Sequence, residues 1–387
     1  MKFHHPHSWL ASISIAALAA ASSLLAVPAQ SAPPPESRVY FGTYDSPTSQ
    51  GIYMADWNPE TGTLGTPVLA GPTSSPSFLA LTPDRKFIIA VNENGTPQNP
   101  GGAVSSWSIN ATTGQLTLVN QRPSHGTAPC HVAVSPDGHT VVIANYGGGS
   151  FASYQLDPAG TLSEAVTVLQ NTGLNTLQGP AIPRGHSATF SPDGQFVFLC
   201  DLGLDRVFSR RVTATTSSMD PNPSPDATVP TGSGPRHFAF HPSLPAAYAI
   251  NETASTMTSF SFDPARGELK PRPAVSTLPA GTTQPNSTAH VAVHPSGKWV
   301  YGSNRGHDSL ARFSIHPATG ELTFEETTPS GGQTPRNFNI NNEGKWLVAA
   351  HQESNSVVVH AIHPTTGTLT RSGPPLTIGK PVCVVFY

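Results

Sequence analysis

The stretch HVAVSPDGHTVVIANYGGGSFASYQLDPAGTL, residues 131–162, contains three short apolar runs separated by turn sequences. Pro136-Asp137-Gly138 separates the first run from the second, and a Gly-x-Leu turn at 160–162 follows the third. Short runs rich in β-branched and aromatic residues, bounded by Gly, Pro and Asp, are typical of antiparallel strands. We interpret this stretch as three strands followed by the turn into a fourth.

The same unit recurs along the chain. Its first turn falls at Pro83, Pro136, Pro192, Pro242, Pro295 and Asn342, with spacings of 53, 56, 50, 53 and 47 residues. Its second turn recurs as NPETGTL (58–64), NATTGQL (110–116), DPAGTL (157–162), DPARGEL (263–269), HPATGEL (316–322) and HPTTGTL (363–369), and is missing between 213 and 231. A period near 50 residues made of short strands, with no helical period, predicts an all-β propeller of four-stranded blades.

The two ends of the chain complement each other. Six full units follow residue 72, whereas residues 39–58 resemble the second and third strands of a unit that lacks its first. Residues 380–387 resemble a first strand that lacks a second. We therefore expect the N- and C-terminal strands to pair and close a seven-bladed propeller over residues 36–387, which removes the open edge of the ring.

The N-terminal segment has the features of a secretory signal peptide. An apolar run from Trp9 to Val27 is followed by small residues at two cleavage sites, after Ala29 and after Ser31. We assign residues 1–31 to a signal peptide and expect a secreted or periplasmic protein, with an uncleaved membrane anchor as the alternative. The three cysteines are too few and odd in number for a disulfide framework.

Composition excludes several classes of protein. Gly and Pro number 34 and 40, charged residues make up only 11% of the chain, and the formal net charge is −3. A coiled coil needs many more charged helix formers, and a nucleic-acid binder needs a basic excess. We therefore expect no nucleic-acid partner and no membrane association after cleavage of the signal; the sequence leaves the oligomeric state open.

Polar residues recur at one end of the predicted hairpins. Residues equally far from a hairpin turn lie opposite each other if the register is regular. That rule predicts the pairs Arg236 with Glu252, His186 with Asp201, His131 with Asn145, His290 with Arg305, Arg336 with Gln352, and Ser77 with Asn92 and Glu93. Because the first strand of each blade is innermost, these side chains are expected to surround one mouth of the central channel.

Several of these segments resemble the bacterial lactonase family, the 6-phosphogluconolactonase type of seven-bladed propeller, to which the fungal carboxy-cis,cis-muconate cyclase is similar. The resemblance covers nearly the whole chain after residue 36. It is most specific in HSATFSPDGQFVFLCDLGLDRV (186–207), GPRHFAFHPSLPAAYAINE (234–252) and VYGSNRGHDSL (300–310).

The resemblance implies a site made of a His at the start of one inner strand, an Arg-His pair, a Glu and a further Arg. These match His186, Arg236 with His237, Glu252 and Arg305. Three positions depart from the family pattern and bear on the substrate. They are Arg184 and Asn337, where a His is expected, and His290, where an acidic residue is common.

Lactone hydrolysis needs a base to activate water and donors to stabilise the tetrahedral oxyanion. We predict His186, Arg236, Glu252 and Arg305 as catalytic, with Glu252 or His186 as the base and the arginines as donors. The predicted substrate-binding residues are His131, His237, His290, Arg336 and Gln352. No cofactor is needed. No metal is expected, because histidines four apart on a strand, such as His237 and His241, lie about 13 Å apart.

Other interpretations stay open at this stage. One alternative is that Arg236 and Glu252 form an ion pair that only joins neighbouring strands and has no role in catalysis. The leading hypothesis is a lactone hydrolase of the 6-phosphogluconolactonase type acting on a small sugar or carboxylated lactone. The alternatives are a non-catalytic propeller that binds a ligand or partner, and a lyase like the carboxymuconate cyclase, which uses the same arginines to hold carboxylates.

Overall fold

The computed structural model describes residues 1–3, 36–96, 101–172 and 182–387. The chain divides into two units, Met1–Pro35 and Glu36–Tyr387. The predicted signal peptide, residues 1–31, lies outside the described residues except for its first three. In the described part of the chain, none of the elements is a helix of the length and hydrophobicity that a membrane crossing requires.

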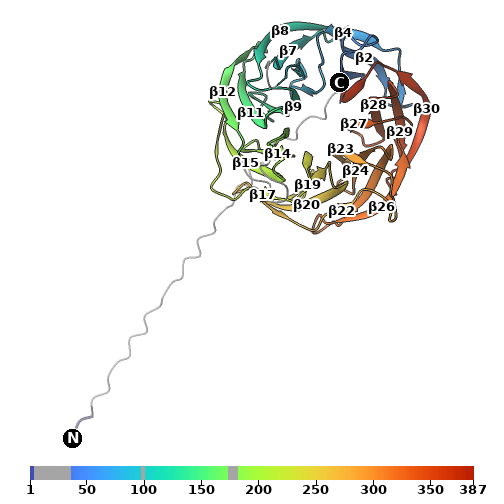
Figure 1. The fold of residues 1–387 in the computed structure, drawn as a ribbon. Coiled ribbons are helices and arrows are strands. Elements are labelled where there is room, and N and C mark those ends of the chain that lie inside the picture. The colour runs from blue at the N-terminus through green and yellow to red at the C-terminus, as the bar shows by residue number, and fades with distance from the viewer. Residues whose placement is uncertain (4–35, 97–100, 173–181) are drawn as a thin grey trace. The chain divides into compact units, whose positions relative to one another are not determined.

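The described part of residues 36–387 forms seven antiparallel sheets around one axis (Figure 1), which confirms the predicted seven-bladed all-β propeller. The innermost strands contact one another around the ring. They are β31 (Pro381–Phe386), β5 (Leu79–Leu81), β9 (Pro129–Val134), β13 (Gly185–Phe190), β18 (Pro235–Phe240), β23 (Ser287–Val293) and β27 (Pro335–Ile340).

Each inner strand is followed outward by two more strands of its blade. The second strands are β1 (Arg38–Thr43), β6 (Phe87–Asn92), β10 (Thr140–Asn145), β14 (Phe196–Asp201), β19 (Ala246–Asn251), β24 (Trp299–Arg305) and β28 (Trp346–His351). The third strands are β2 (Gly51–Asn58), β7 (Ala103–Ile109), β11 (Ser150–Leu156), β15 (Arg206–Thr213), β20 (Thr256–Asp263), β25 (Ser309–Ile315) and β29 (Ser356–Ile362).

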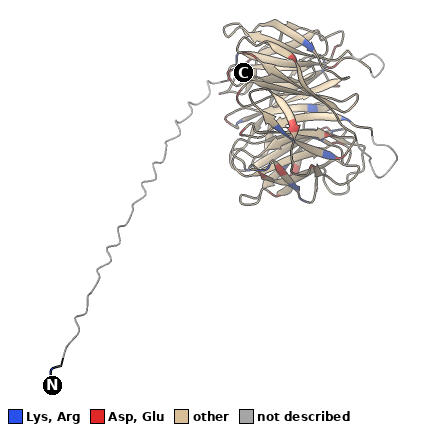
Figure 2. Cartoon of the chain, turned by 90° about the vertical axis from the view of Figure 1, so that its left-hand side faces the viewer, with Lys and Arg blue, Asp and Glu red and all other residues tan. Residues whose placement is uncertain are grey.

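The outermost strands complete the blades, and in three blades the outermost strand is split in two. They are β3 (Thr63–Leu64) with β4 (Val68–Pro72), β8 (Leu116–Pro123), β12 (Leu162–Gln170), β16 (Ser218–Pro221) with β17 (Ala227–Thr228), β21 (Glu268–Pro271) with β22 (Val275–Ser276), β26 (Leu322–Pro329) and β30 (Leu369–Thr377). Seen from the side in Figure 2, the blades carry few acidic or basic residues, as the composition requires.

The ring closes as predicted. β1 pairs with β31, with Tyr40 opposite Val385 and Phe41 opposite Val384. The last residue extends the closure, because the backbone N–H groups of Ser37 and Arg38 both donate to the carbonyl of Tyr387 at 2.7 Å. The first blade therefore combines strands from both ends of the chain, and neither end leaves an unpaired inner edge.

The predicted register of the hairpins is wrong at the polar end. In β13 and β14, Gly185 lies opposite Asp201 and Ser187 opposite Cys200, so His186 is an unpaired extra residue. The same irregularity leaves Arg236, Arg336, Cys130 and Val382 unpaired and displaces His290. His131 consequently lies opposite Ala144, not Asn145, and Arg305 lies opposite Ser287, not His290. Counting from the turn assumes that each residue of one strand lies opposite one residue of its partner. A β-bulge breaks this rule, because it places two residues of one strand opposite a single residue and changes the direction of their side chains.

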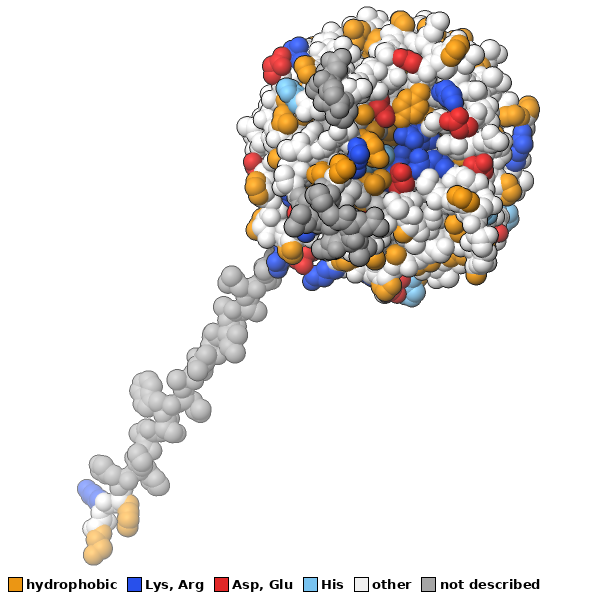
Figure 3. Space-filling model, viewed as in Figure 1, with side chains coloured by type: hydrophobic (Ala, Val, Ile, Leu, Met, Phe, Trp, Pro, Cys, Tyr) orange, Lys and Arg blue, Asp and Glu red, His pale blue; other side chains and the backbone are white. Residues whose placement is uncertain are grey.

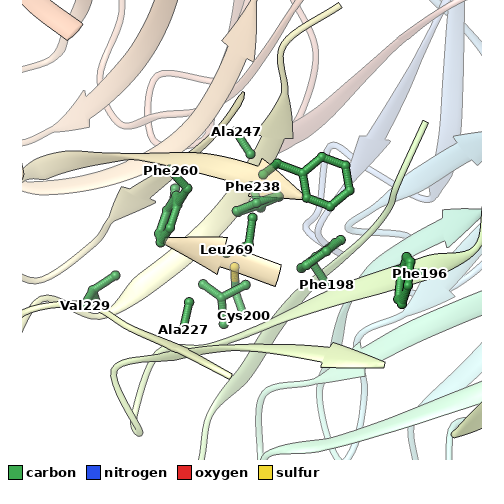
Figure 4. Packing of buried hydrophobic residues seen from close by; sticks show 12 residues of the cluster. Phe196, Phe198, Cys200, Ala227, Val229, Phe238, Ala247, Phe260 and Leu269 are labelled. Carbon is green, nitrogen blue, oxygen red and sulfur yellow. The ribbon is translucent and has the colours of Figure 1, made fainter. Parts of the chain in front are cut away.

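Hydrophobic side chains pack between neighbouring blades. Phe196 and Phe198 from one blade meet Phe238 and Phe260 from the next, and Cys200 lies in the same cluster (Figure 4). Complete burial of one such aromatic side chain is worth about 2–3 kcal/mol. Six further clusters of this kind join other parts of the described ring, so the interfaces between blades form the core.

The glycine of the repeated Gly-x-Leu turn is an inter-blade contact. Gly160 and Gly367 have φ of +82° and +71°, and a Cβ on either would lie 2.2 Å from Phe87 or 2.5 Å from Trp299 of the adjacent blade. Where the motif is missing, Ser217 adopts φ 59° and its hydroxyl lies 2.9 Å from that of Thr140. The repeated glycine thus marks a position where an aromatic ring of the adjacent blade packs directly against backbone that has no Cβ.

Replacement of this glycine is expected to destabilise the propeller. Gly367→Ala places a methyl group against Trp299 at positive φ, and we expect a loss of about 3 kcal/mol or more in the free energy of unfolding. Gly373→Ala is the matched control, because Gly373 has φ +72° with no atom within 4 Å of the added Cβ, so it should lose only about 1 kcal/mol. Equal losses for the two variants in denaturant unfolding would contradict the inter-blade contact.

Candidate active site

One face of the propeller carries a central group of charged side chains. Figure 3 shows basic side chains gathered in a hollow near the centre of this face, beside acidic and hydrophobic ones. Ion pairs join Glu252 to Arg236 and Arg305, and hydrogen bonds join Tyr44 to Glu93 and Arg336. The charge of Arg336 also acts on Glu252, and we call these six residues the mouth cluster. All six lie where inner strands begin or second strands end, so the predicted gathering of Arg236, Glu252, Arg305 and Arg336 is observed.

Glu252 follows β19 and receives two guanidinium groups. Its Oε2 accepts from Arg236 Nε at 2.7 Å and lies 3.0 Å from Arg305 Nη2. Burial by itself would raise the pKa of the Glu252 carboxyl, but Arg236, Arg305 and Arg336 outweigh burial and lower it. Glu252 therefore stays ionised over a wide pH range and is a weak base.

Arg236 is the most buried member of the mouth cluster. Its residue is 2% exposed, and besides Glu252 its Nη1 donates to the Ala289 carbonyl at 2.6 Å and to His237 Nε2 at 3.2 Å. Burial and the two nearby arginines lower its pKa. Because a guanidinium starts from a very high pKa and this one touches a carboxylate, Arg236 remains charged at neutral pH.

Arg305 and Arg336 keep donor groups free. Arg305 Nη2 donates to the Thr288 carbonyl at 2.7 Å, while its buried Nε has no partner among the described residues. Arg336 Nη2 donates to the Tyr44 hydroxyl at 2.9 Å, and its guanidinium lies 5.3 Å from the centre of the Tyr44 ring. Unused N–H groups on two neighbouring arginines provide a binding site for an anion.

Four histidines form a layer beside the arginines. The rings of His131, His186 and His290 lie 5.2, 5.3 and 5.0 Å from the ring of His237. Burial lowers the pKa of His131 and His290 to about 3, and that of His186 and His237 well below the ordinary value. All four are therefore neutral at pH 7. Since Arg236 donates to His237 Nε2, we assign the proton of His237 to Nδ1, which donates to His290 Nδ1 at 2.7 Å.

The histidine layer closes the channel behind the mouth. His131 stacks on Phe78 with ring centres 4.1 Å apart, and His186 lies against Cys130, with Nδ1 3.7 Å from Sγ. His131 also lines a cavity of about 450 Å³ between the inner strands. The other residues that line this cavity are mostly apolar, such as Ala133 and Phe190. The two ends of the channel thus differ in chemistry, because charged side chains gather at one end and apolar residues line most of the other.

Gln352 and Glu93 are where sequence and structure differ most. Gln352 lies after β28, where its amide donates to Glu353 at 2.8 Å, and no hydrogen bond among the described residues joins its side chain to the mouth cluster. Glu93 and Tyr44 belong to the mouth cluster but were not predicted as site residues. A signal for Glu93 was present, since Asn92-Glu93 ends its strand as Asn251-Glu252 ends another. Tyr44 offered no such signal.

Metal binding finds no support in the geometry. Among the described residues, 1–3, 36–96, 101–172 and 182–387, His, Cys, Asp and Glu side chains nowhere form a group of three or more arranged to hold an ion. His237 and His290 instead satisfy each other through their Nδ1 atoms.

This chain is similar to known proteins described as lactonases. Residues 38–386 match the model of a family described as lactonase, seven-bladed β-propeller. The 6-phosphogluconolactonase of Bacillus subtilis is 30% identical over 301 residues, which cover 77% of this chain and 83% of the relative. The 6-phosphogluconolactonase of Formosa agariphila is 28% identical over 309 residues, 78% of this chain and 86% of the relative.

Among solved structures, the periplasmic gluconolactonase of Pseudomonas aeruginosa superposes on this chain with a TM-score of 0.84. The two sequences are 28% identical, and the superposition covers 90% of this chain and 98% of the other. This similarity extends over nearly the whole propeller and both of its faces.

The histidine layer should make the fold sensitive to acid. Each neutral histidine has a folded pKa below its unfolded value near 6.5, so its stabilisation is present above that pH and is lost as the pH falls toward 3. We expect denaturant unfolding to show a loss of a few kcal/mol between about pH 7.5 and about pH 4.5. His290→Gln should reduce this loss, whereas His139→Gln, at an exposed turn, should not. An unchanged loss in His290→Gln would contradict the assignment of a neutral histidine.

Proposed function

This chain belongs to the lactonase family of seven-bladed β-propellers, and we propose that it hydrolyses a sugar lactone at its mouth cluster. The observation that carries the assignment to this site is the pair of arginines with unused donors, Arg305 and Arg336, beside the buried ion pair of Arg236 and Glu252. Hydrolysis of a lactone converts a neutral ester into an oxyanion and then a carboxylate. A site for this reaction therefore needs preorganised cations where the negative charge develops.

The charge balance of the mouth cluster suits that reaction. Arg236, Arg305 and Arg336 contribute three positive charges, whereas Glu252 and Glu93 contribute at most two negative ones, so a positive excess remains. Arg305 is held in place by the Thr288 carbonyl and Glu252, so its guanidinium group is preorganised to stabilise the oxyanion. Preorganised donors of this kind commonly contribute a factor of 100 or more to the rate.

Arg236 and Glu252 have a positioning role in this proposal. The donors that Arg236 uses toward Glu252, Ala289 and His237 fix its orientation. Glu252 in turn joins Arg236 to Arg305 through one oxygen, so it holds the two guanidinium groups side by side. His186, neutral and 3% exposed behind the arginines, supports the wall of the site and is too weak a base to activate water efficiently.

We propose an unphosphorylated six-carbon sugar lactone as the substrate. The predicted signal peptide favours a location outside the cytoplasm, where phosphorylated sugar intermediates are not normally available. The similar Pseudomonas aeruginosa protein is named a periplasmic gluconolactonase, which agrees with both parts of this proposal. In this interpretation the positive excess binds the carboxylate that forms in the reaction, and the substrate needs no charge of its own.

A panel of lactones tests the proposed function directly. We expect acid release from glucono-1,5-lactone, with less from its 6-phosphate and none from a carboxylated muconolactone. Arg305→Gln should lower kcat/KM by about 100-fold, because it removes an oxyanion donor while the strands around it are kept. Arg266→Gln, an exposed arginine on the outer edge, is the matched control and should retain full activity. No hydrolysis of any lactone would favour a propeller that only binds its ligand.

Export of the protein is a separate prediction. We expect the mature chain to start at Gln30 or Ala32 and to appear in the periplasm or the medium, because the two small-residue sites follow the apolar run. N-terminal sequencing of the protein from fractionated cells checks this. A chain that keeps Met1 and sediments with membranes would show that the segment is an anchor instead.

A further inference from the structure

Glu93 occupies the same place in its blade as Glu252 does in another. It directly follows β6 in the sequence AVNEN (90–94), and Glu252 directly follows β19 in AINET (249–253). In each hairpin the backbone N–H of the glutamate donates to the inner segment, to the Ser75 carbonyl at 2.9 Å and to the Gly234 carbonyl at 2.7 Å. The repeat therefore delivers two carboxyl groups to one channel mouth.

The two carboxyl groups have different partners. Glu252 is held by two guanidinium groups, whereas Glu93 Oε2 accepts a hydrogen bond from the Tyr44 hydroxyl at 2.9 Å. That hydroxyl in turn accepts from Arg336 Nη2 at 2.9 Å, so Arg336 acts on Glu93 through Tyr44. Within the described part of the chain Glu93 forms no direct ion pair, which leaves its carboxylate available for proton transfer.

Glu93 also lines a small cavity behind the arginines. The cavity has a volume of about 10 Å³, which is the room that one water molecule needs. Glu93, Arg236 and Arg336 contribute its polar wall, and Phe78 and Val382 contribute apolar parts. A water in this cavity can contact a base on one side and cationic donors on the other.

The pKa values of Glu93 and Glu252 are shifted in opposite directions. Burial raises the pKa of Glu93 above its ordinary value, although Arg336, Tyr44 and Arg236 oppose the rise. The pKa of Glu252 is shifted in the opposite direction, since the lowering effect of the arginines exceeds the effect of burial. Two carboxyl groups whose environments push their pKa values apart are characteristic of a division of roles, and the group with a pKa nearer the working pH is the better proton acceptor.

We propose that Glu93 is the general base of the lactonase, that the cavity beside it holds the attacking water, and that Glu252 only positions the arginines. The proposal rests on the proposed function of the mouth cluster and adds a catalytic residue to it. It assigns the proton transfer to the carboxyl group that lies closest to a water-sized space and lacks a direct cationic partner.

The reaction balances with this assignment. The Glu93 carboxylate takes a proton from water as the water oxygen bonds to the carbonyl carbon, and the carbonyl electron pair moves to the oxygen facing the arginines. When the tetrahedral intermediate collapses, the ring C–O bond breaks and the leaving alkoxide takes the proton from Glu93. The products are an open-chain hydroxy acid and the regenerated carboxylate, and the acid releases its own proton to solvent.

The pH dependence follows from the groups that face Glu93. These are Tyr44 after β1, Arg336 on β27, Arg236 and His237 on β18, and Cys130 on β9. Burial raises the pKa of both Tyr44 and Cys130, and His237 is neutral, so none of these three changes charge between pH 5 and 8. The acidic limb of kcat/KM therefore reports Glu93, because the base must lose its proton before it can act.

Glu93→Gln is the decisive variant, assayed with glucono-1,5-lactone across pH. We expect kcat to fall by about 100-fold or more, KM to stay within about threefold, and the acidic limb to disappear. Tyr44→Phe removes a hydrogen bond that stabilises the charged form of Glu93, so its acidic limb should move to higher pH. Glu353→Gln, which removes a carboxyl group at the exposed rim, is the matched control and should behave as wild type.

The outcomes separate this proposal from the proposed function. If wild type opens the lactone but Glu93→Gln keeps its rate and its acidic limb, Glu93 is not the base and only this proposal fails. If Glu252→Gln removes the limb and Glu93→Gln does not, the roles of the two glutamates are reversed. If wild type opens no lactone, both proposals fail. Should Glu93→Gln fold poorly, the direction of the shift in Tyr44→Phe decides, and an unmoved limb there counts against Glu93.

Discussion

The antiparallel pairing of β1 with β31 is the constraint on which the site depends. It joins the two ends of the chain in one blade and so fixes the distance between blades that are far apart in sequence. Tyr44 and Arg336 are separated by 292 positions, yet their side chains meet at 2.9 Å because Tyr44 follows β1 and Arg336 is the second residue of β27. Without closure the mouth cluster would lose Tyr44, and with it the contact that links Arg336 to Glu93.

The bulges on the inner strands supply the second requirement. Each bulge adds a residue near the arginine end of an inner strand, and in three blades that residue is His186, Arg236 or Arg336. Placing a guanidinium in a nearly dry environment costs several kcal/mol unless it is paired and hydrogen-bonded. Arg236 meets that condition through Glu252, the Ala289 carbonyl and His237, while the apolar packing between blades provides the stability that permits it.

The fold could be predicted from the sequence because the propeller repeats one unit, and each repeat shows the same pattern of strands and turns. The sequence was also sufficient to collect Arg236, Glu252, Arg305 and Arg336 at one mouth, since an error of one residue does not move a side chain to the other end of a strand. The register of the inner hairpins could not be predicted, because no residue type identifies the position of a β-bulge. Tyr44 was missed because the residue after β1 carries no charge that would have marked it as part of the site.

We place the hydrolytic site among the arginines of one mouth of the propeller. A crystal structure of the protein with bound gluconate, the carboxylate product, would locate this site. We expect the product carboxylate between Arg305 and Arg336, with an oxygen within hydrogen-bond distance of a guanidinium nitrogen of each. Gluconate bound in the apolar cavity beyond the histidine layer, with the arginines untouched, would contradict it.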